Sequence, residues 1–297
     1  MTSTRRRGIA GVVVSASATQ VGAAFGVTII PLVGPVGVVA LRQAIAAIVL
    51  LAVTRPSLRR LGARRLAPAV LLGIALLVMN TSFYAALQRA DLGLVVTVEF
   101  LGPLGVALAA SRRGRDLALG ALALAGVVAL TVPLGSAGAT APDALGLLLA
   151  LAAAVAWAGY IVLSQRAGRA LPGVVGTAVG SAVASVCTLP VLVLAVLALP
   201  AAQLPHVLAI GALTGLLSSA LPYSIDILVL RTLPRSLFGM LQSLHPVAAA
   251  VFGLLVLDQR LDALQIAGIG AVCLANVLVV ASTRPAVVAS GEGELIG

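Results

Sequence analysis

The sequence contains no lysine and little charge of either sign. All nineteen basic residues are arginine, and only 9% of the 297 residues are charged, against roughly 25% in globular domains. Without lysine there is no Walker A loop, which excludes ATP binding of that kind. No polar stretch reaches the ~50 residues that a small soluble domain needs. The net charge of +10 does not indicate nucleic acid, because the arginines are spread over short loops rather than gathered on one face.

Cysteine and recognisable catalytic patterns are also scarce. The two cysteines, Cys187 and Cys273, fall in separate apolar runs and predict neither a disulfide framework nor a metal site. No nucleophile–base pair or HExxH motif stands out, so neither an enzyme, a metal nor a cofactor is expected. The start, M-T-S-T-R-R-R, resembles a signal peptide, but the apolar stretch 9–14 before a cleavage motif is too short. We interpret it as an uncleaved first span.

Long apolar runs fill the rest of the chain. Hydrophobic residues make up 61% of it and the mean hydropathy is +1.16. Ten runs of about twenty residues each could span a bilayer as helices; they cover 9–31, 36–53, 67–86, 92–110, 117–134, 143–163, 173–199, 206–230, 236–257 and 263–282. With the amino terminus inside, sixteen arginines fall on the cytoplasmic side and only Arg89 and Arg260 outside. The sequence predicts an all-α membrane protein of ten transmembrane helices with both termini cytoplasmic.

One span carries a carboxylate and a helix breaker together. Glu99 lies inside the apolar run 92–110, and a charged group at membrane depth usually serves a purpose. Pro103 cannot donate to the carbonyl of Glu99, and Gly102 and Gly105 leave room for close approach. Carboxylate, freed carbonyl and small residues therefore mark a candidate site.

The same layout returns in the ninth span. Gln242 stands four residues before Pro246, as Glu99 stands four before Pro103. This echo predicts two five-helix repeats, 1–136 and 143–284, followed by a short tail, 285–297. An odd number of spans inverts the second repeat, and inverted repeats place substrate sites near the membrane midplane.

Other polar residues within the spans leave alternatives open. Arg42 either faces the interior, where it could pair with Glu99, or snorkels to the surface. Asp226 lies five residues before Arg231 and is either an interfacial carboxylate or part of a site. It follows Pro222, which is expected to free the Ser218 carbonyl for a ligand or water. His245 shares a predicted helical face with Gln242 and either carries a proton or packs as a hydrogen-bonded core residue. Inter-helix hydrogen bonding is the main expectation for four further residues, with cavity lining as the alternative: Gln20, Asn80, Trp157 and Tyr160.

Several stretches resemble the EamA group of the drug/metabolite transporter superfamily, and more closely its bacterial threonine and homoserine exporters. E-F-L-G-P-L at 99–104 and A-L-P-Y-S at 220–224 are the most specific, and W-A-G-Y at 157–160 is common across the group. Further similar stretches are 22–24, 31–34, 40–42, 79–80, 83–84, 111–113, 165–168 and 246–249. The chain departs from the pattern at Val27, where a lysine is expected, at His245, where a glutamate is expected, and at Asp258–Gln259, where Gly-Glu is usual.

The resemblance implies ten helices in inverted repeats and proton-driven efflux of small amino acids across the bacterial inner membrane. Seven residues match positions that the family keeps polar or aromatic: Glu99, Arg42, Asn80, Trp157, Tyr160, Tyr223 and Asp226. We therefore predict an exporter of threonine- or homoserine-like amino acids, in which Glu99 carries the coupling proton. Arg42 and the freed carbonyls would orient the zwitterion. The alternative substrates are a purine, an aromatic metabolite or a drug, and the oligomeric state is open, a homodimer included.

Overall fold

The structure is a computed structural model that describes residues 3–56, 62–109, 114–131, 143–230, 238 and 241–282. Every regular element in these residues is helical. In chain order they are α1 (Ser3–Thr28), α2 (Ile30–Thr54), α3 (Ala63–Ala86), α4 (Leu92–Glu99), α5 (Leu101–Ala109), α6 (Gly114–Thr131), α7 (Ala144–Ala170), α8 (Val175–Ala198), α9 (Leu204–Gly215), the π-helical turn η2 (Leu216–Ala220), α10 (Leu221–Leu230), α12 (Leu244–Leu257) and α13 (Ala263–Ser282).

The helices account for the ten apolar runs of the sequence. Within the described ranges, eight helical stretches are long and apolar enough to cross a membrane, and two shorter apolar helices, Leu117–Leu130 and Leu244–Leu257, complete the set. Many large apolar side chains on their outer faces are exposed, for example Val155 and Leu197, as expected of a surface that faces lipid. The prediction of a multi-pass, all-helical membrane protein is confirmed.

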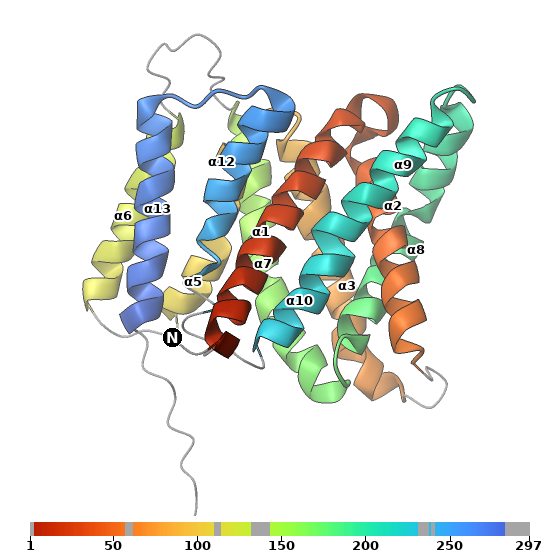
Figure 1. Ribbon diagram of the computed structural model, residues 1–297, viewed down its shortest axis with the longest axis horizontal. Coiled ribbons are helices and arrows are strands. Elements are labelled where there is room, and N and C mark those ends of the chain that lie inside the picture. The colour runs from red at the N-terminus through yellow and green to blue at the C-terminus, as the bar shows by residue number, and fades with distance from the viewer. Residues whose placement is uncertain are drawn as a thin grey trace, which may run out of the picture.

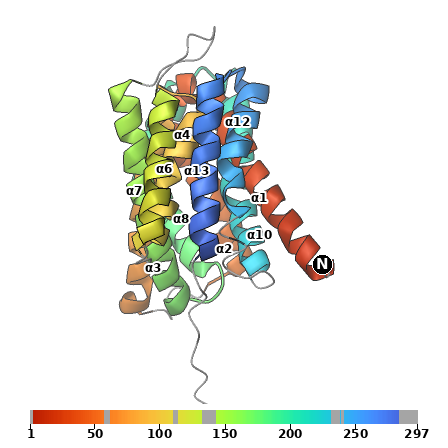
Figure 2. The same ribbon diagram turned by 90° about the vertical axis from the view of Figure 1, so that its left-hand side faces the viewer.

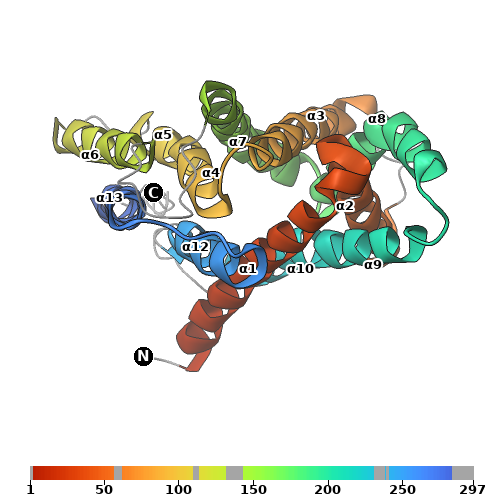
Figure 3. The same cartoon turned by 90° about the horizontal axis from the view of Figure 1, so that it is seen from above.

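Seen from above, the helices form two layers (Figure 3). One contains α6, α5, α4, α7 and α3, and the other contains α13, α12, α1, α10 and α9. The first helix of each half of the chain packs mainly against helices of the other half. α1, from the first half, lies along α12 and α10, and α7, from the second half, lies along α3. At one end of the molecule α2 packs along α8, and at the other α6 packs along α13.

Both described ends of the chain lie at one end of the bundle (Figure 1). The amino-terminal part of α1 projects from the other helices there (Figure 2). The starts of α1, α3 and α6 and the ends of α2 and α7 lie at this end and carry eight described arginines: Arg6, Arg7, Arg55, Arg64, Arg65, Arg115, Arg166 and Arg169. Arg89 follows the end of α3, and Arg260 lies between α12 and α13, so both are at the opposite end of the bundle. The described part of the chain therefore keeps the two-sided arginine distribution from which the topology was predicted.

The predicted fourth and ninth spans are both interrupted at the expected positions. Glu99 ends α4, Phe100 forms a turn, and α5 begins at Leu101. In the ninth span, Gln242 and Ser243 form a turn before α12. The interruptions follow from the prolines at Pro103 and Pro246, which remove a donor and clash with the preceding turn.

Two further spans depart from regular helix. In α2, Gly34 has a φ of 68° and is followed by Pro35, and the helix kinks at this point. Glycine adopts such a positive φ without the steric cost that other residues pay. The predicted eighth span contains η2, directly before α10, whose second residue is Pro222. Single π-helical turns of this kind frequently occur at functional sites.

Glycine contacts bring several helices close together. A Cβ on Gly102 would lie 2.2 Å from the Ala154 carbonyl oxygen of α7, and one on Gly73 would lie 2.6 Å from the Gly180 oxygen of α8. Small residues at such contacts are typical of membrane helices. The expectation for Gly105 was wrong, because a Cβ there would meet nothing within 4 Å.

An ion pair joins the two halves beyond the spans. Arg89, after α3, pairs with Asp143, which caps α7 by accepting from the Gly146 amide. The Gly146 amide and the Arg89 guanidinium hold the pKa of this carboxyl below its usual value. The predicted joint at 137–142 and the tail 285–297 lie outside the described residues.

Candidate functional site

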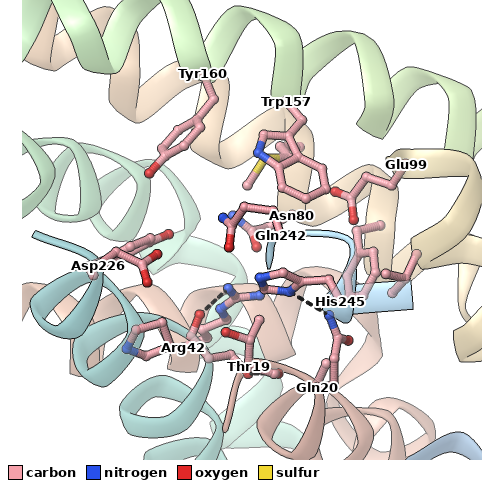
Figure 4. A pocket seen from close by; sticks show the side chains of 17 residues that line it. Thr19, Gln20, Arg42, Asn80, Glu99, Trp157, Tyr160, Asp226, Gln242 and His245 are labelled. Atoms are coloured by element: carbon pink, nitrogen blue, oxygen red, sulfur yellow. Dashed lines mark hydrogen bonds between the residues drawn. The ribbon is translucent and has the colours of Figure 1, made fainter. Parts of the chain in front are cut away.

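A cavity lies between the two layers of helices (Figure 4). Its volume of about 130 Å³ far exceeds the roughly 10–15 Å³ that one water molecule requires. The lining comes from both halves of the chain and consists of Thr19, Gln20, Ala23, Arg42, Met79, Asn80, Phe83, Val96, Glu99, Trp157, Tyr160, Ser218, Pro222, Tyr223, Asp226, Gln242 and His245. A cavity of this size with both aromatic and charged residues on its wall suits a small polar solute.

Arg42 is held at the cavity wall by η2. Its Nε donates to Ser219 Oγ at 2.8 Å, and its Nη2 donates to the Ser218 carbonyl at 2.6 Å. Two of its five N–H donors are thus used, and they share one edge of the planar group. The outer edge carries both terminal nitrogens, and the guanidinium also interacts with the hydroxyl groups of Tyr84 and Tyr223. That edge offers the paired donors that bind a carboxylate in two-point fashion.

The surroundings of Arg42 contradict three expectations. The Ser218 carbonyl is not free for a ligand, because Arg42 occupies it. Arg42 also forms no ion pair with Glu99 among the residues that the structure describes. The side chain is 6% exposed, so it does not snorkel to the surface.

The two acidic residues of the cavity differ in how they are held. Asp226 accepts a hydrogen bond of 2.7 Å from Ser15 Oγ of α1. Glu99 is 8% exposed and has no hydrogen-bond or ion-pair partner within the described residues. Figure 4 shows the two carboxyl groups toward opposite sides of the cavity.

His245 lies at the start of α12, next to aromatic rings. Its Nδ1 lies 3.2 Å from the side-chain amide nitrogen Nε2 of Gln20, within hydrogen-bond distance. The ring meets Trp157 edge-on at 6.4 Å between centroids, and Trp157 meets Phe100 at 5.5 Å. The Gln242 carbonyl, expected to be freed by Pro246, accepts from the His245 amide at 2.9 Å instead.

The structure gathers all nine predicted polar and aromatic candidates, and Pro222, around this one cavity. Pro103 and Pro246 are not part of its lining. Asn80, expected to bond between helices, donates to the Leu76 carbonyl of its own helix. Sequence reasoning missed Thr19, Met79 and Phe83, although each lies within four residues of a predicted candidate, and it missed the Ser15 bond to Asp226 entirely.

Comparison with known proteins places this cavity within a transporter. The chain is 38% identical over 263 residues to the threonine/homoserine exporter RhtA of Salmonella typhimurium, covering 89% of this chain and 88% of that protein. It is also 38% identical over 266 residues to the protein of the same name from Escherichia coli K12, with the same coverage. The chain belongs to the EamA-like transporter family. The family's own sequence profile matches residues 144–281, the second half of this EamA protein.

A solved crystal structure superposes on this EamA protein with a TM-score of 0.58 at 21% sequence identity. The match covers 95% of this chain and 96% of the other and supports the fold alone. Because its relatives are transporters, the family resemblance and the expectation of a transporter rather than an enzyme are confirmed.

Proposed function

We propose that this EamA protein is a secondary-active exporter of small polar amino acids such as threonine and homoserine, driven by the proton gradient. The observation that carries the proposal is the cavity between the two layers of helices, which has Arg42 and the two carboxyl groups of Glu99 and Asp226 on its wall. A zwitterionic amino acid needs both signs of charge in one site. The relatives' names support the substrate class, since both are threonine/homoserine exporters.

The two halves, 1–136 and 143–284, act in this proposal as inverted five-helix repeats. The matched interruptions after Glu99 and Gln242 support it. So does the pairing of helices: a two-fold operation that exchanges the halves maps the α3–α7 contact onto the α10–α1 contact and leaves α2–α8 and α6–α13 in place. Rocking of one repeat against the other would expose the cavity to each side in turn.

Glu99 carries the coupling proton in this mechanism. It ends α4 at the interruption, lies on the cavity wall, and is held by none of the described side chains, so its carboxyl can rotate as the cavity opens. In this proposal the protein lies in the bacterial inner membrane. The arginine-rich end of the bundle and both termini are on the cytoplasmic side.

The test is uptake of labelled threonine into inverted membrane vesicles, where export appears as accumulation. An acidic lumen should drive accumulation in vesicles that contain the protein and not in vesicles without it. Unlabelled homoserine should compete, whereas a purine and an aromatic amino acid should not. Uptake that ignores the pH gradient would refute proton coupling, and competition by the purine alone would refute the substrate class.

A further inference from the structure

A groove on the outer surface lies between α2 and α8 and shares no residue with the cavity around Glu99. Its volume is about 320 Å³, and its lining consists of Leu51 of α2 and five residues of α8: Val179, Ala182, Val183, Val186 and Cys187. All of these side chains are apolar apart from the Cys187 thiol. Val186 is 68% exposed and Cys187 is exposed as well, so the groove opens away from the bundle. Inside a membrane, a hydrocarbon chain fits such a lining.

The groove covers the depth of one leaflet of a bilayer. α8 begins at Val175, at the arginine-rich end of the bundle (Figure 1). The lining residues of α8 run from Val179 to Cys187. At about 1.5 Å per residue they extend from ~6 Å to ~18 Å along the helix, and half of the hydrocarbon core of a bilayer is ~15 Å thick. An acyl chain that enters from the arginine-rich surface can therefore lie along the groove for most of its length.

Arg55 lies where the groove meets this surface. Its backbone amide donates to the Leu51 carbonyl at 2.8 Å, so Arg55 caps α2 one turn beyond the groove. Its Nε donates to the Ala52 carbonyl at 3.3 Å. The residue is exposed, and its four other N–H donors have no partner among the described residues. These donors can bind a phosphate group.

Two further arginines lie on the same side of the groove. Leu66, in the first turn of α3, packs against the apolar cluster that contains Val179. Arg64 and Arg65 directly precede Leu66 and are exposed. Within the described part of the chain, neither they nor Arg55 form an ion pair. An apolar groove that ends at unpaired arginines is complementary to a lipid with an apolar chain and an anionic head group.

We propose that this groove binds an anionic phospholipid, with one acyl chain along α8 and the phosphate held by Arg55 in the field of Arg64 and Arg65. The head group then contacts helices of the first half of the chain, while the acyl chain lies on a helix of the second half. The lipid therefore bridges the two halves from outside. The site is separate from the proposed transport function, because it shares no lining residue with the cavity.

Native mass spectrometry of the purified protein tests the head-group preference. The protein is titrated with phosphatidylglycerol and with phosphatidylcholine of identical acyl chains, and the dissociation constant of the first bound lipid is measured. The wild type should bind phosphatidylglycerol at least about 5-fold more tightly, since one arginine near an anionic head group is worth ~1 kcal/mol, or about 5-fold. Arg55→Gln should lose about 5-fold in affinity for phosphatidylglycerol and keep its affinity for phosphatidylcholine.

Arg115→Gln is the matched control for the charge. Arg115 is also exposed and lies at the same end of the bundle, but at the start of α6, on the other side of the molecule from α8 (Figures 1 and 3). This variant should bind phosphatidylglycerol as the wild type does. Equal affinity of the wild type for the two lipids would overturn the proposal, and so would equal losses in Arg55→Gln and Arg115→Gln.

A second pair of variants tests the groove itself. Ala182→Phe places a ring where the acyl chain would lie and keeps every arginine, so it should weaken the binding of both lipids by about 10-fold or more. Val155→Phe adds the same ring to the outer face of α7, where Val155 is 74% exposed, and should change neither affinity. Equal effects of the two variants would mean that the lipid binds no particular groove. Threonine uptake is not part of these measurements, so their outcome is independent of the test of the proposed function.

Discussion

The interruptions of the fourth and ninth spans share a backbone plan but are held differently. Three residues after Glu99 stands Gly102, whose backbone packs against Ala154 of α7. Three residues after Gln242 stands His245, whose side chain bonds Gln20 of α1. The first interruption is thus fixed by direct backbone packing and carries a carboxyl group. The second is tied by side-chain hydrogen bonds and carries a carboxamide.

The second interruption has a further tie that the first lacks among the described residues. Ser243, in its turn, accepts from Asn276 Nδ2 of α13 at 2.7 Å, and its carbonyl accepts from Cys273 Sγ at 3.3 Å. The matching turn residue in the fourth span is Phe100, which packs on Trp157. The comparison teaches that similar bends can be held in unlike ways, one leaving a carboxyl group without a hydrogen-bond partner among the described residues and the other anchored by side-chain hydrogen bonds.

The largest expected effect comes from making the two interruptions chemically alike. Glu99→Gln keeps the shape of the side chain but cannot titrate, so gradient-driven threonine export should fall by about 100-fold or more. Exchange of labelled for unlabelled threonine without a gradient should persist. Flux is measured in vesicles and normalised to folded protein.

Adding Arg42→Gln to this variant separates a proton carrier from a mere counter-ion. Restored driven flux in the double variant would mean that Glu99 only neutralises Arg42, and it would refute the role assigned here. The absence of a Glu99–Arg42 ion pair in the described structure leads us to expect no restoration.

An intermediate effect is expected from Gly102→Ala, which disturbs the backbone packing of the first interruption. The new Cβ would lie 2.2 Å from a backbone oxygen that cannot move cheaply, so α5 must shift from α7. Overpacking of this kind costs about 1–3 kcal/mol. Gly105→Ala, one helical turn away in open space, is the control and should be neutral or slightly stabilising. Equal melting temperatures for the two variants would contradict the close α5–α7 contact.

The smallest effect should come from loosening the second interruption. Ser243→Ala removes the hydrogen bond from Asn276, and hydrogen bonds between membrane helices average about 0.6 kcal/mol. The melting temperature should fall by a few degrees at most, while driven flux per folded protein stays the same. A large loss of flux with unchanged stability would show that this turn takes part in transport and is no mere anchor.

The sequence predicted the spans and interruptions well, for clear physical reasons. Apolar length marks a span, and a proline four residues after a polar group marks a break, because both signals are local. Eight of the nine candidate residues were found because polar and aromatic side chains are conspicuous in apolar helices, and Tyr223 came from the family resemblance.

The contacts among those residues were beyond local reasoning. The Ser218 carbonyl was recognised as freed, but its partner, Arg42, lies 176 residues away in the chain. Ser15 and Asp226 are 211 residues apart, and nothing near either residue signals the pair. Gly102 and Gly105 look equivalent in sequence, and only the position of α7 distinguishes them. Pairings of this kind depend on how whole helices face one another.

The π-helical turn η2 also sets the angular phase of the eighth span. Each residue of an α-helix advances the direction of its side chain by about 100°, and a π-helical turn holds one residue more than an α-helical one. The Gly211 and Gly215 face of α9, which packs on α2, is therefore offset by about one residue from the Pro222 and Asp226 face of α10. Removing a single residue from η2 would let the span wind as a continuous α-helix and would turn Asp226 away from the cavity wall. The number of residues in this turn thus shapes the cavity as much as their chemistry does.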